Sequence, residues 1–240
     1  MNYFFNGVQV DYEFKSKNNK VVDVFLHGWG RSKEDFLEII NELKIENYLI
    51  LDFPPFGKSG LIKDFTIYTY ASVVMSLIDN LKIEKFNLIG HSFGGRVAII
   101  IAGKEKERIN KLVLIDSAGL KPKLKFSKRI KLLKYKIRKR LKMNVEEYGS
   151  SDYRSLSFEM KKVFVSVVNT FLDENAKIIE AQTLIIYGKN DQETPIYMAK
   201  KFNKLISNST LRIIENAGHF CFIERKIKFC EILDKFLRSN

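Results

Sequence analysis

The stretch Gly90-His91-Ser92-Phe93-Gly94-Gly95 decides the fold of this chain. The short apolar run before it, residues 86–89, indicates a strand, and the longer run after it, residues 97–102, indicates a helix. A Gly-x-Ser-x-Gly motif at such a junction predicts a sharp turn that holds Ser92 in a strained backbone conformation. Glycine is needed two residues on either side, because a side chain there would collide. The pattern therefore indicates a nucleophilic serine exposed at a sheet edge.

Length and composition indicate one α/β domain with an insertion. The 240 residues are 45% apolar, which is enough for one sizeable core. The first residues show no basic stretch followed by an apolar one, so we expect no secretory leader. No apolar run approaches the ~20 residues that span a bilayer. Two cysteines, Cys221 and Cys230, are too few for a disulfide framework, and we expect a cytoplasmic protein.

Positive charge is concentrated in one segment. Of the net charge of +13, residues 121–142 supply +12, with twelve Lys or Arg and no Asp or Glu. Apolar residues recur in it at helical spacing, which predicts an amphipathic basic helix; they are Phe126, Ile130, Leu133, Ile137 and Leu141. Such a helix is often only a solvated face. It is also suited to an anionic membrane surface or an acidic protein partner. We expect no nucleic-acid binding, because no nucleic-acid module is recognisable.

Strand-like and helix-like runs alternate along most of the chain. Strands are expected at residues 8–14, 21–26, 48–53, 85–89, 111–115, 183–187 and 210–214. Helices are expected at about residues 33–43, 66–81, 97–102, 195–205 and 224–237. Repeated βα units of this kind predict an α/β fold with a mostly parallel sheet that is flanked by helices on both faces.

The interval 119–173 breaks this alternation and predicts a helical cap. It contains helical patterns, including one at 158–171, and little strand signal. Inserted between two core strands, it is expected over the carboxyl ends of the sheet, where α/β sites form. We therefore divide the chain into a core, residues 1–118 and 174–240, and a cap, residues 119–173.

Three residues far apart in sequence are suited to nucleophilic catalysis. Serine needs a base within hydrogen-bond reach and a third group that orients the base. His219 follows the last expected strand and Asp191 follows the one before it, so both lie at the same sheet edge as Ser92. The side chain of His91 is expected to point away, and His27 is expected to brace its own loop. The order Ser92, Asp191, His219 is that of the α/β-hydrolase triad.

The chain resembles a small, capped serine hydrolase of the α/β-hydrolase superfamily. The matching segments are distributed along nearly the whole core, which is about three quarters of the chain, and they are residues 27–30 (His-Gly-Trp-Gly), 52–59, 90–95, 184–191 and 218–219. The resemblance implies an oxyanion hole formed by the N–H groups of Trp29 and Phe93. It also implies carboxylic-ester hydrolysis with no metal or organic cofactor. Pro55 replaces a glycine that is usual in relatives and removes an N–H there.

The substrate and some roles stay open at this stage. The His-Gly-Trp-Gly turn and the basic cap are similar to those of esterases that act on pimeloyl–acyl carrier protein methyl ester, which makes an acyl carrier protein one expected partner. The same triad also serves carbon–carbon bond hydrolases and acyltransferases, and a non-catalytic binding protein is a further alternative. Asp116 is the rival acid. Tyr153 and Arg154 lie in a polar turn of the cap, where Arg154 is a candidate for binding a substrate carboxylate or phosphate.

Overall fold

The computed structural model describes residues 1–17, 21–123 and 151–239. Eight strands form one sheet in the order β1-β2-β4-β3-β5-β6-β7-β8. The β1–β2 and β2–β4 pairs are antiparallel and all other pairs are parallel, as the alternation predicted. The strands are β1 (Asn2–Phe5), β2 (Val8–Lys15), β3 (Val22–Leu26), β4 (Tyr48–Leu51), β5 (Phe86–His91), β6 (Ile109–Ile115), β7 (Gln182–Gly188) and β8 (Ser209–Ile214).

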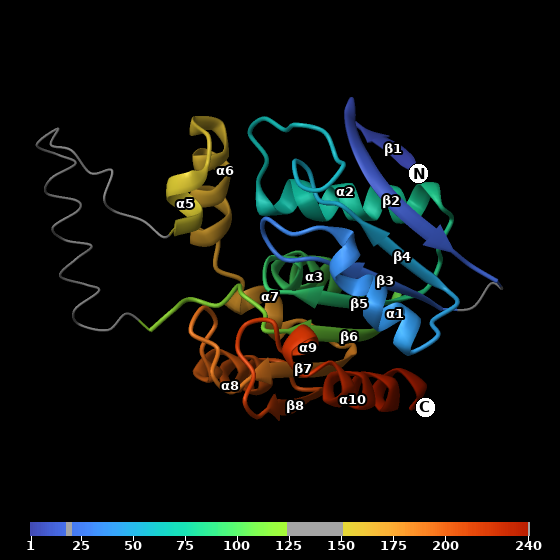
Figure 1. Cartoon of the computed structure of the whole chain (residues 1–240), viewed down its shortest axis with the longest axis vertical. Coiled ribbons are helices and arrows are strands. Elements are labelled where there is room, and N and C mark those ends of the chain that lie inside the picture. Colours follow the sequence, from blue (N-terminus) through green and yellow to red (C-terminus); the bar gives the residue numbers. More distant parts are fainter. Residues whose placement is uncertain (18–20, 124–150, 240) are drawn as a thin grey trace, which may run out of the picture.

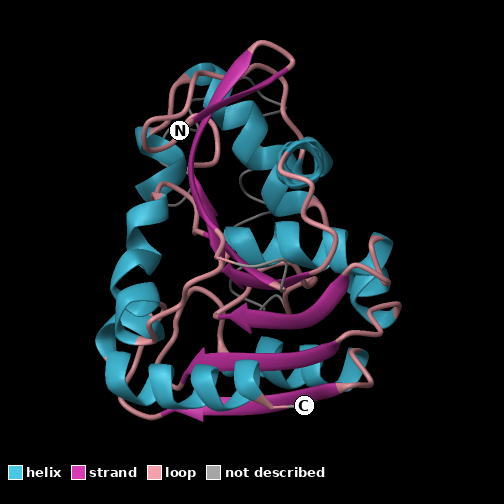
Figure 2. Ribbon diagram, turned by 90° about the vertical axis from the view of Figure 1, so that its right-hand side faces the viewer, coloured by secondary structure: helices cyan, strands magenta, loops and turns pink. Residues whose placement is uncertain are grey.

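Helices cover both faces of this sheet (Figure 1). One face packs against α2 (Ile67–Asn80), α3 (Phe93–Lys104), α7 (Asp173–Lys177) and α8 (Ile196–Leu205). The other face packs against α1 (Leu37–Glu42) with the 3₁₀ turn η1 (Lys33–Phe36), α9 (Cys221–Glu224) and α10 (Lys226–Arg238). Figure 2 shows the resulting layers, with the N-terminal strands twisted steeply away from the rest of the sheet.

Two apolar cores follow from the alternation of side chains along each strand. On β5, Leu88 belongs to the core beneath α2 and α3, whereas its neighbour Ile89 belongs to the core beneath α1 and α10. Both side chains are fully buried. Because both faces of the central strands are covered, these strands are almost continuously apolar, which explains why they were recognisable as short apolar runs.

The interval that broke the alternation is partly described. It contains α5 (Ser151–Ser155) and α6 (Phe158–Asn169), which stand apart from the helices flanking the sheet (Figure 1). We expected a polar turn where α5 lies. The predicted basic helix falls on residues 124–150, outside the described residues. At its return to the core, Leu172 N donates to Gly119 O at 2.8 Å. Among the helices of the described part, none is long and apolar enough to cross a membrane.

Candidate active site

Ser92 occupies the turn between β5 and α3. Its backbone angles are φ 49° and ψ −105°, a left-handed conformation that a residue with a side chain adopts only under strain. The surrounding backbone enforces this turn: a Cβ on Gly94 would lie 2.1 Å from the carbonyl oxygen of Leu26. The predicted need for glycine there therefore has a direct cause, which is close packing of α3 against the end of β3.

His219 lies within hydrogen-bond reach of the serine. Its Nε2 is 2.9 Å from Ser92 Oγ, and its Nδ1 is 2.8 Å from Asp191 Oδ2. The side chain of His219 is only 8% exposed and that of Asp191 is fully buried. The structure thus brings together the three residues that the sequence predicted as neighbours, from the ends of β5, β7 and β8.

Asp191 is held by its own turn as well as by His219. Its Oδ1 accepts hydrogen bonds from the backbone N–H groups of Glu193 (2.7 Å) and Thr194 (3.0 Å). The Thr194 hydroxyl donates to Asp191 Oδ2 at 2.6 Å. Asp191 is therefore both a cap of the turn before α8 and a partner of His219. Sequence reasoning missed Thr194, although its position three residues after an acid is typical of such a turn.

Asp191 and His219 shift each other's pKa. Burial alone would raise the pKa of Asp191, but its hydrogen bond to His219 and the charge of that ring outweigh burial and lower the pKa. Burial alone would lower the pKa of His219, but the hydrogen bond and charge of Asp191, with smaller contributions from Glu193 and Asp116, raise it. The pair is therefore suited to stabilise a positive imidazolium beside Ser92.

Asp116, the rival acid, follows β6 and does not contact His219. It is fully buried, and its carboxylate accepts hydrogen bonds from Gly188 N at 2.8 Å and Cys221 N at 3.3 Å. Burial raises its pKa to about 7. Asp116 thus links the loop that precedes Asp191 with the loop that carries His219, which is a supporting position.

Trp29 and Phe93 lie next to each other at the predicted oxyanion hole. Their rings meet edge to face with centroids 5.3 Å apart. Neither backbone N–H donates a hydrogen bond to any described residue. The Trp29 ring also packs on Phe56 (4.9 Å) and on Phe164 of α6 (5.2 Å), so α6 covers this side of the site.

The other two histidines support loops around the site. His27 Nε2 accepts a hydrogen bond from Phe53 N at 2.8 Å, and its Nδ1 lies 2.7 Å from Gly28 O, so it braces its loop as predicted. His91 points away from Ser92 Oγ, but its Nε2 reaches the carbonyl oxygen of His219 at 2.8 Å. This contact places His91 behind the loop of His219.

The two cap residues proposed for substrate contact are not brought to Ser92. Tyr153 of α5 packs its ring on Phe164 with centroids 6.1 Å apart, so one ring separates it from Trp29. Arg154 is exposed, and no contact joins it to Ser92 or His219. A substrate role for either residue stays a prediction.

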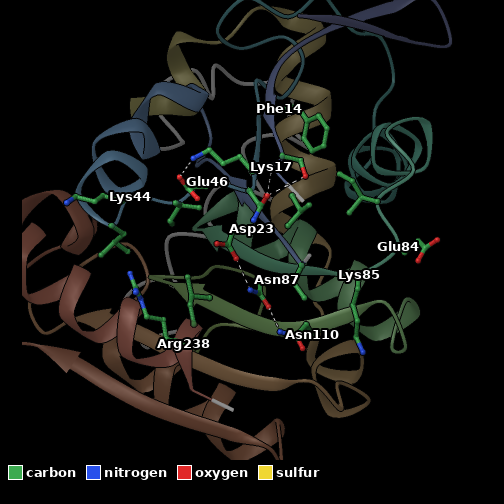
Figure 3. A pocket seen from close by; sticks show the side chains of 18 of the residues that line it. Phe14, Lys17, Asp23, Lys44, Glu46, Glu84, Lys85, Asn87, Asn110 and Arg238 are labelled. Atoms are coloured by element: carbon green, nitrogen blue, oxygen red, sulfur yellow. Dashed lines mark hydrogen bonds and ion pairs between the residues drawn. The ribbon is translucent and has the colours of Figure 1, made fainter. Parts of the chain in front are cut away.

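A cavity of about 1530 Å³ opens at the opposite, amino-terminal edge of the sheet (Figure 3). On its wall, Asn87 donates to Asp23 at 2.7 Å and accepts from Asn110 at 2.8 Å. Burial raises the pKa of Asp23 to about 6. No histidine is among the residues that line this cavity, so it offers no imidazole base for a serine, and the candidate site stays at the carboxyl edge. Within the described residues, no group of three or more His, Cys, Asp or Glu side chains is placed to hold a metal ion.

Comparison with known proteins agrees with this architecture. The model of the alpha/beta hydrolase fold family matches residues 24–131 and 124–226, so the chain belongs to that family and is a hydrolase of the α/β-hydrolase kind. An uncharacterized hydrolase of Bacillus subtilis, YugF, is 27% identical over 97% of this chain and 96% of its own. The mouse monoacylglycerol lipase ABHD6 is 28% identical over 96% of this chain and 80% of its own. The crystal structure of a bacterial membrane phospholipase A superposes with a TM-score of 0.80, at 21% identity, over 99% of this chain and 84% of that chain, which is a likeness of fold.

Proposed function

We propose that the protein hydrolyses carboxylic esters through an acyl-enzyme on Ser92. The observation that carries this proposal is the hydrogen-bonded chain from Ser92 Oγ through His219 to Asp191, with separations of 2.9 and 2.8 Å. A strained serine with a buried, acid-oriented imidazole is the arrangement that activates a hydroxyl at neutral pH.

In the first half of the reaction, Ser92 Oγ forms a bond with the ester carbonyl carbon, and His219 Nε2 takes the hydroxyl proton. The carbonyl oxygen becomes an oxyanion, which the N–H groups of Trp29 and Phe93 are proposed to bind. The carbon–oxygen bond to the alcohol then breaks, and His219 returns the proton to the leaving oxygen. Asp191 stays ionised throughout and stabilises the imidazolium.

In the second half, water replaces the alcohol. His219 removes a proton from water as its oxygen attacks the acyl carbon, and it then protonates Ser92 Oγ when the acid leaves. Each proton that leaves an oxygen is returned to one, so no other reactant is needed.

Residues 119–173 are proposed to form a cap that shapes the acyl site, because Phe164 of α6 already contacts Trp29. The name of the monoacylglycerol lipase relative supports acylglycerol esters as the first natural class to test. Esters carried by an acyl carrier protein stay a second prediction, which depends on the basic segment at 121–142.

The test is hydrolysis of p-nitrophenyl esters with two to twelve acyl carbons by the wild type and by Ser92→Ala. Turnover that the substitution abolishes would support the proposal, and the chain-length optimum would measure the acyl pocket. A folded wild type that cleaves neither these esters nor monoacylglycerols would contradict it and would favour a carbon–carbon bond hydrolase, a transferase or a binding protein.

A further inference from the structure

Glu193 places a carboxylate beside the catalytic face of His219. Its Oε2 is 3.3 Å from His219 Nε2, the atom that also lies 2.9 Å from Ser92 Oγ. The Glu193 side chain is 63% exposed, whereas that of His219 is 8% exposed. His219 Nε2 therefore lies between the Ser92 hydroxyl and the solvent-accessible carboxylate of Glu193.

The backbone of Glu193 is held by hydrogen bonds of its turn. Glu193 N donates to Asp191 Oδ1 at 2.7 Å, and Pro195, two residues later, begins the approach to α8. The neighbouring Thr194 is buried and hydrogen-bonded to Asp191. Glu193 therefore belongs to the same hydrogen-bonded turn as the triad acid.

Among the described residues, the charged partner of Glu193 is His219. Among the described residues, no lysine or arginine lies within ion-pair distance of its carboxylate, although the chain as a whole carries a net charge of +13. Within the described part of the chain, Glu193 is thus a solvent-exposed acid whose ion-pair partner is the imidazole of His219 and not a lysine or arginine.

The proposed reaction defines what must pass this carboxylate. His219 Nε2 protonates the leaving oxygen, so that oxygen must come within about 3 Å of Nε2. The alcohol attached to that oxygen then lies beside Glu193. A partly exposed carboxylate attracts a cation or accepts a hydrogen bond there, and it repels an anion.

We propose that Glu193 determines specificity for the alcohol half of the ester. It favours alcohols that are cationic or that carry further hydroxyl groups, and it disfavours alcohols that carry an anionic group. This inference rests on the proposed ester hydrolysis and assigns the substrate class on the leaving-group side of the same site.

The experiment uses three esters with the same butyryl group, made with choline, with its neutral isostere 3,3-dimethylbutanol, and with the anionic alcohol isethionate. We compare kcat/KM for the wild type, Glu193→Gln and Glu193→Lys. Glu180→Gln is the matched control, because Glu180 is an exposed glutamate just before β7, at the opposite sheet edge. Ratios between esters are compared between variants, so that differences in the intrinsic reactivity of the alcohols cancel.

We expect the choline-to-isethionate ratio of kcat/KM to fall about threefold to tenfold in Glu193→Gln, as for one partly screened charge. It should fall further in Glu193→Lys and stay unchanged in Glu180→Gln. Equal scaling of all three esters in the Glu193 variants would overturn the inference while leaving ester hydrolysis intact. If the wild type cleaves none of the three esters and also fails on the p-nitrophenyl esters and monoacylglycerols, both proposals are overturned.

Discussion

His91 Nε2 donates a hydrogen bond to the backbone carbonyl oxygen of His219 at 2.8 Å. The acceptor is a carbonyl, so the proton of neutral His91 must be on Nε2. Its Nδ1 is buried and has no hydrogen-bond partner among the described residues. A Cβ on Gly28 would lie 2.9 Å from that Nδ1, so the ring fills the space between the loop of Trp29 and the loop of His219. His91 thus positions two parts of the candidate site from the strand that carries Ser92.

The buried ring of His91 predicts acid sensitivity. Burial lowers its pKa to about 3, from an ordinary value of 6.5. Below pH 6.5 the unfolded chain therefore binds a proton at this residue while the folded protein does not, and stability is lost as the pH falls from about 6.5 towards 3. Glutamine keeps a donor for the His219 carbonyl and does not titrate. Both proteins should lose unfolding free energy when the pH is lowered from 7 to 4.5. We expect this loss to be smaller in His91→Gln than in the wild type, by roughly 2–3 kcal/mol.

Urea titrations at pH 7, 5.5 and 4.5 measure this difference. Other titrating groups, including Asp116 with its raised pKa, are common to both proteins and cancel in the comparison. Parallel pH profiles for the two proteins would show that His91 is protonated in the folded state and would contradict the prediction.

The two acids near His219 predict different consequences of substitution. Asp191 contacts the imidazole directly, so Asp191→Asn should lower kcat for p-nitrophenyl butyrate by about 10⁴-fold, as loss of a triad acid does. The Asp116 carboxylate accepts hydrogen bonds from the backbone N–H groups of Gly188 and Cys221 and none from His219, so Asp116→Asn should keep kcat within about tenfold while lowering the urea midpoint, because one donor loses its acceptor. An inactive but stable Asp116→Asn together with an active Asp191→Asn would reverse the assignment.

Much of the core was predictable because its signals are local. Each buried strand is a short apolar run, and the turn at Ser92 carries its own glycines, so fold class and the order of Ser92, Asp191 and His219 followed from the sequence. The ends of elements were less accurate: β5 continues to His91, beyond the apolar run that indicated it. The N-terminal strand β1 was missed because it has only four residues and its side chains alternate between exposed and half-buried, with none fully buried.

Contacts between distant loops could not be predicted in the same way. The bond from His91 to the His219 carbonyl, the two N–H groups on Asp116 and the approach of Glu193 to Nε2 depend on how three loops meet at one sheet edge. Nothing in the local pattern around these residues distinguishes them from solvent-facing or capping residues. Their roles became visible only from the packing.

Arg96 is expected to hold the cap helix α6 in place. It lies one turn after Ser92 on α3, is buried, and donates from Nη1 to the carbonyl oxygens of Val167 (3.0 Å) and Thr170 (2.8 Å) at the end of α6. Burial lowers its pKa to about 10, so it stays charged at neutral pH and suits the negative end of the helix. Arg96→Met should loosen α6 and thereby uncover Trp29, which contacts Phe164.

Trp29 is the single tryptophan of the chain, so its fluorescence reports this change directly. We expect a red-shifted emission and stronger acrylamide quenching in Arg96→Met, with no change in the exposed control Arg212→Met. Unchanged quenching in a folded Arg96→Met would show that α6 is held by its apolar contacts alone.

The raised pKa of His219 predicts the pH dependence of activity. His219 accepts the Ser92 proton only when neutral, so kcat/KM should rise with pH through a midpoint above 6.5. Asp191, Glu193 and Asp116 raise this pKa, and neutral His91 faces the ring from β5. Glu193→Gln should move the midpoint to lower pH because one negative charge is removed. A midpoint that stays fixed in Glu193→Gln, measured with p-nitrophenyl butyrate in buffers of constant ionic strength, would show that this charge is screened.

The basic segment predicts an anionic partner for the cap. Residues 121–142 hold twelve positive charges, and each one near an anionic surface contributes about 1 kcal/mol of attraction. Replacing Lys128, Arg129, Lys136 and Arg140 by Gln should therefore weaken sedimentation with vesicles rich in phosphatidylglycerol, or binding to an acyl carrier protein, at least tenfold. Turnover of p-nitrophenyl butyrate should be unchanged, because that substrate needs no partner.

The charge-matched control replaces the exposed lysines of the opposite edge and C-terminal helix, Lys44, Lys82, Lys85 and Lys235. Equal loss in the control would indicate general charge attraction, and no loss in either variant would leave the segment as a solvated face.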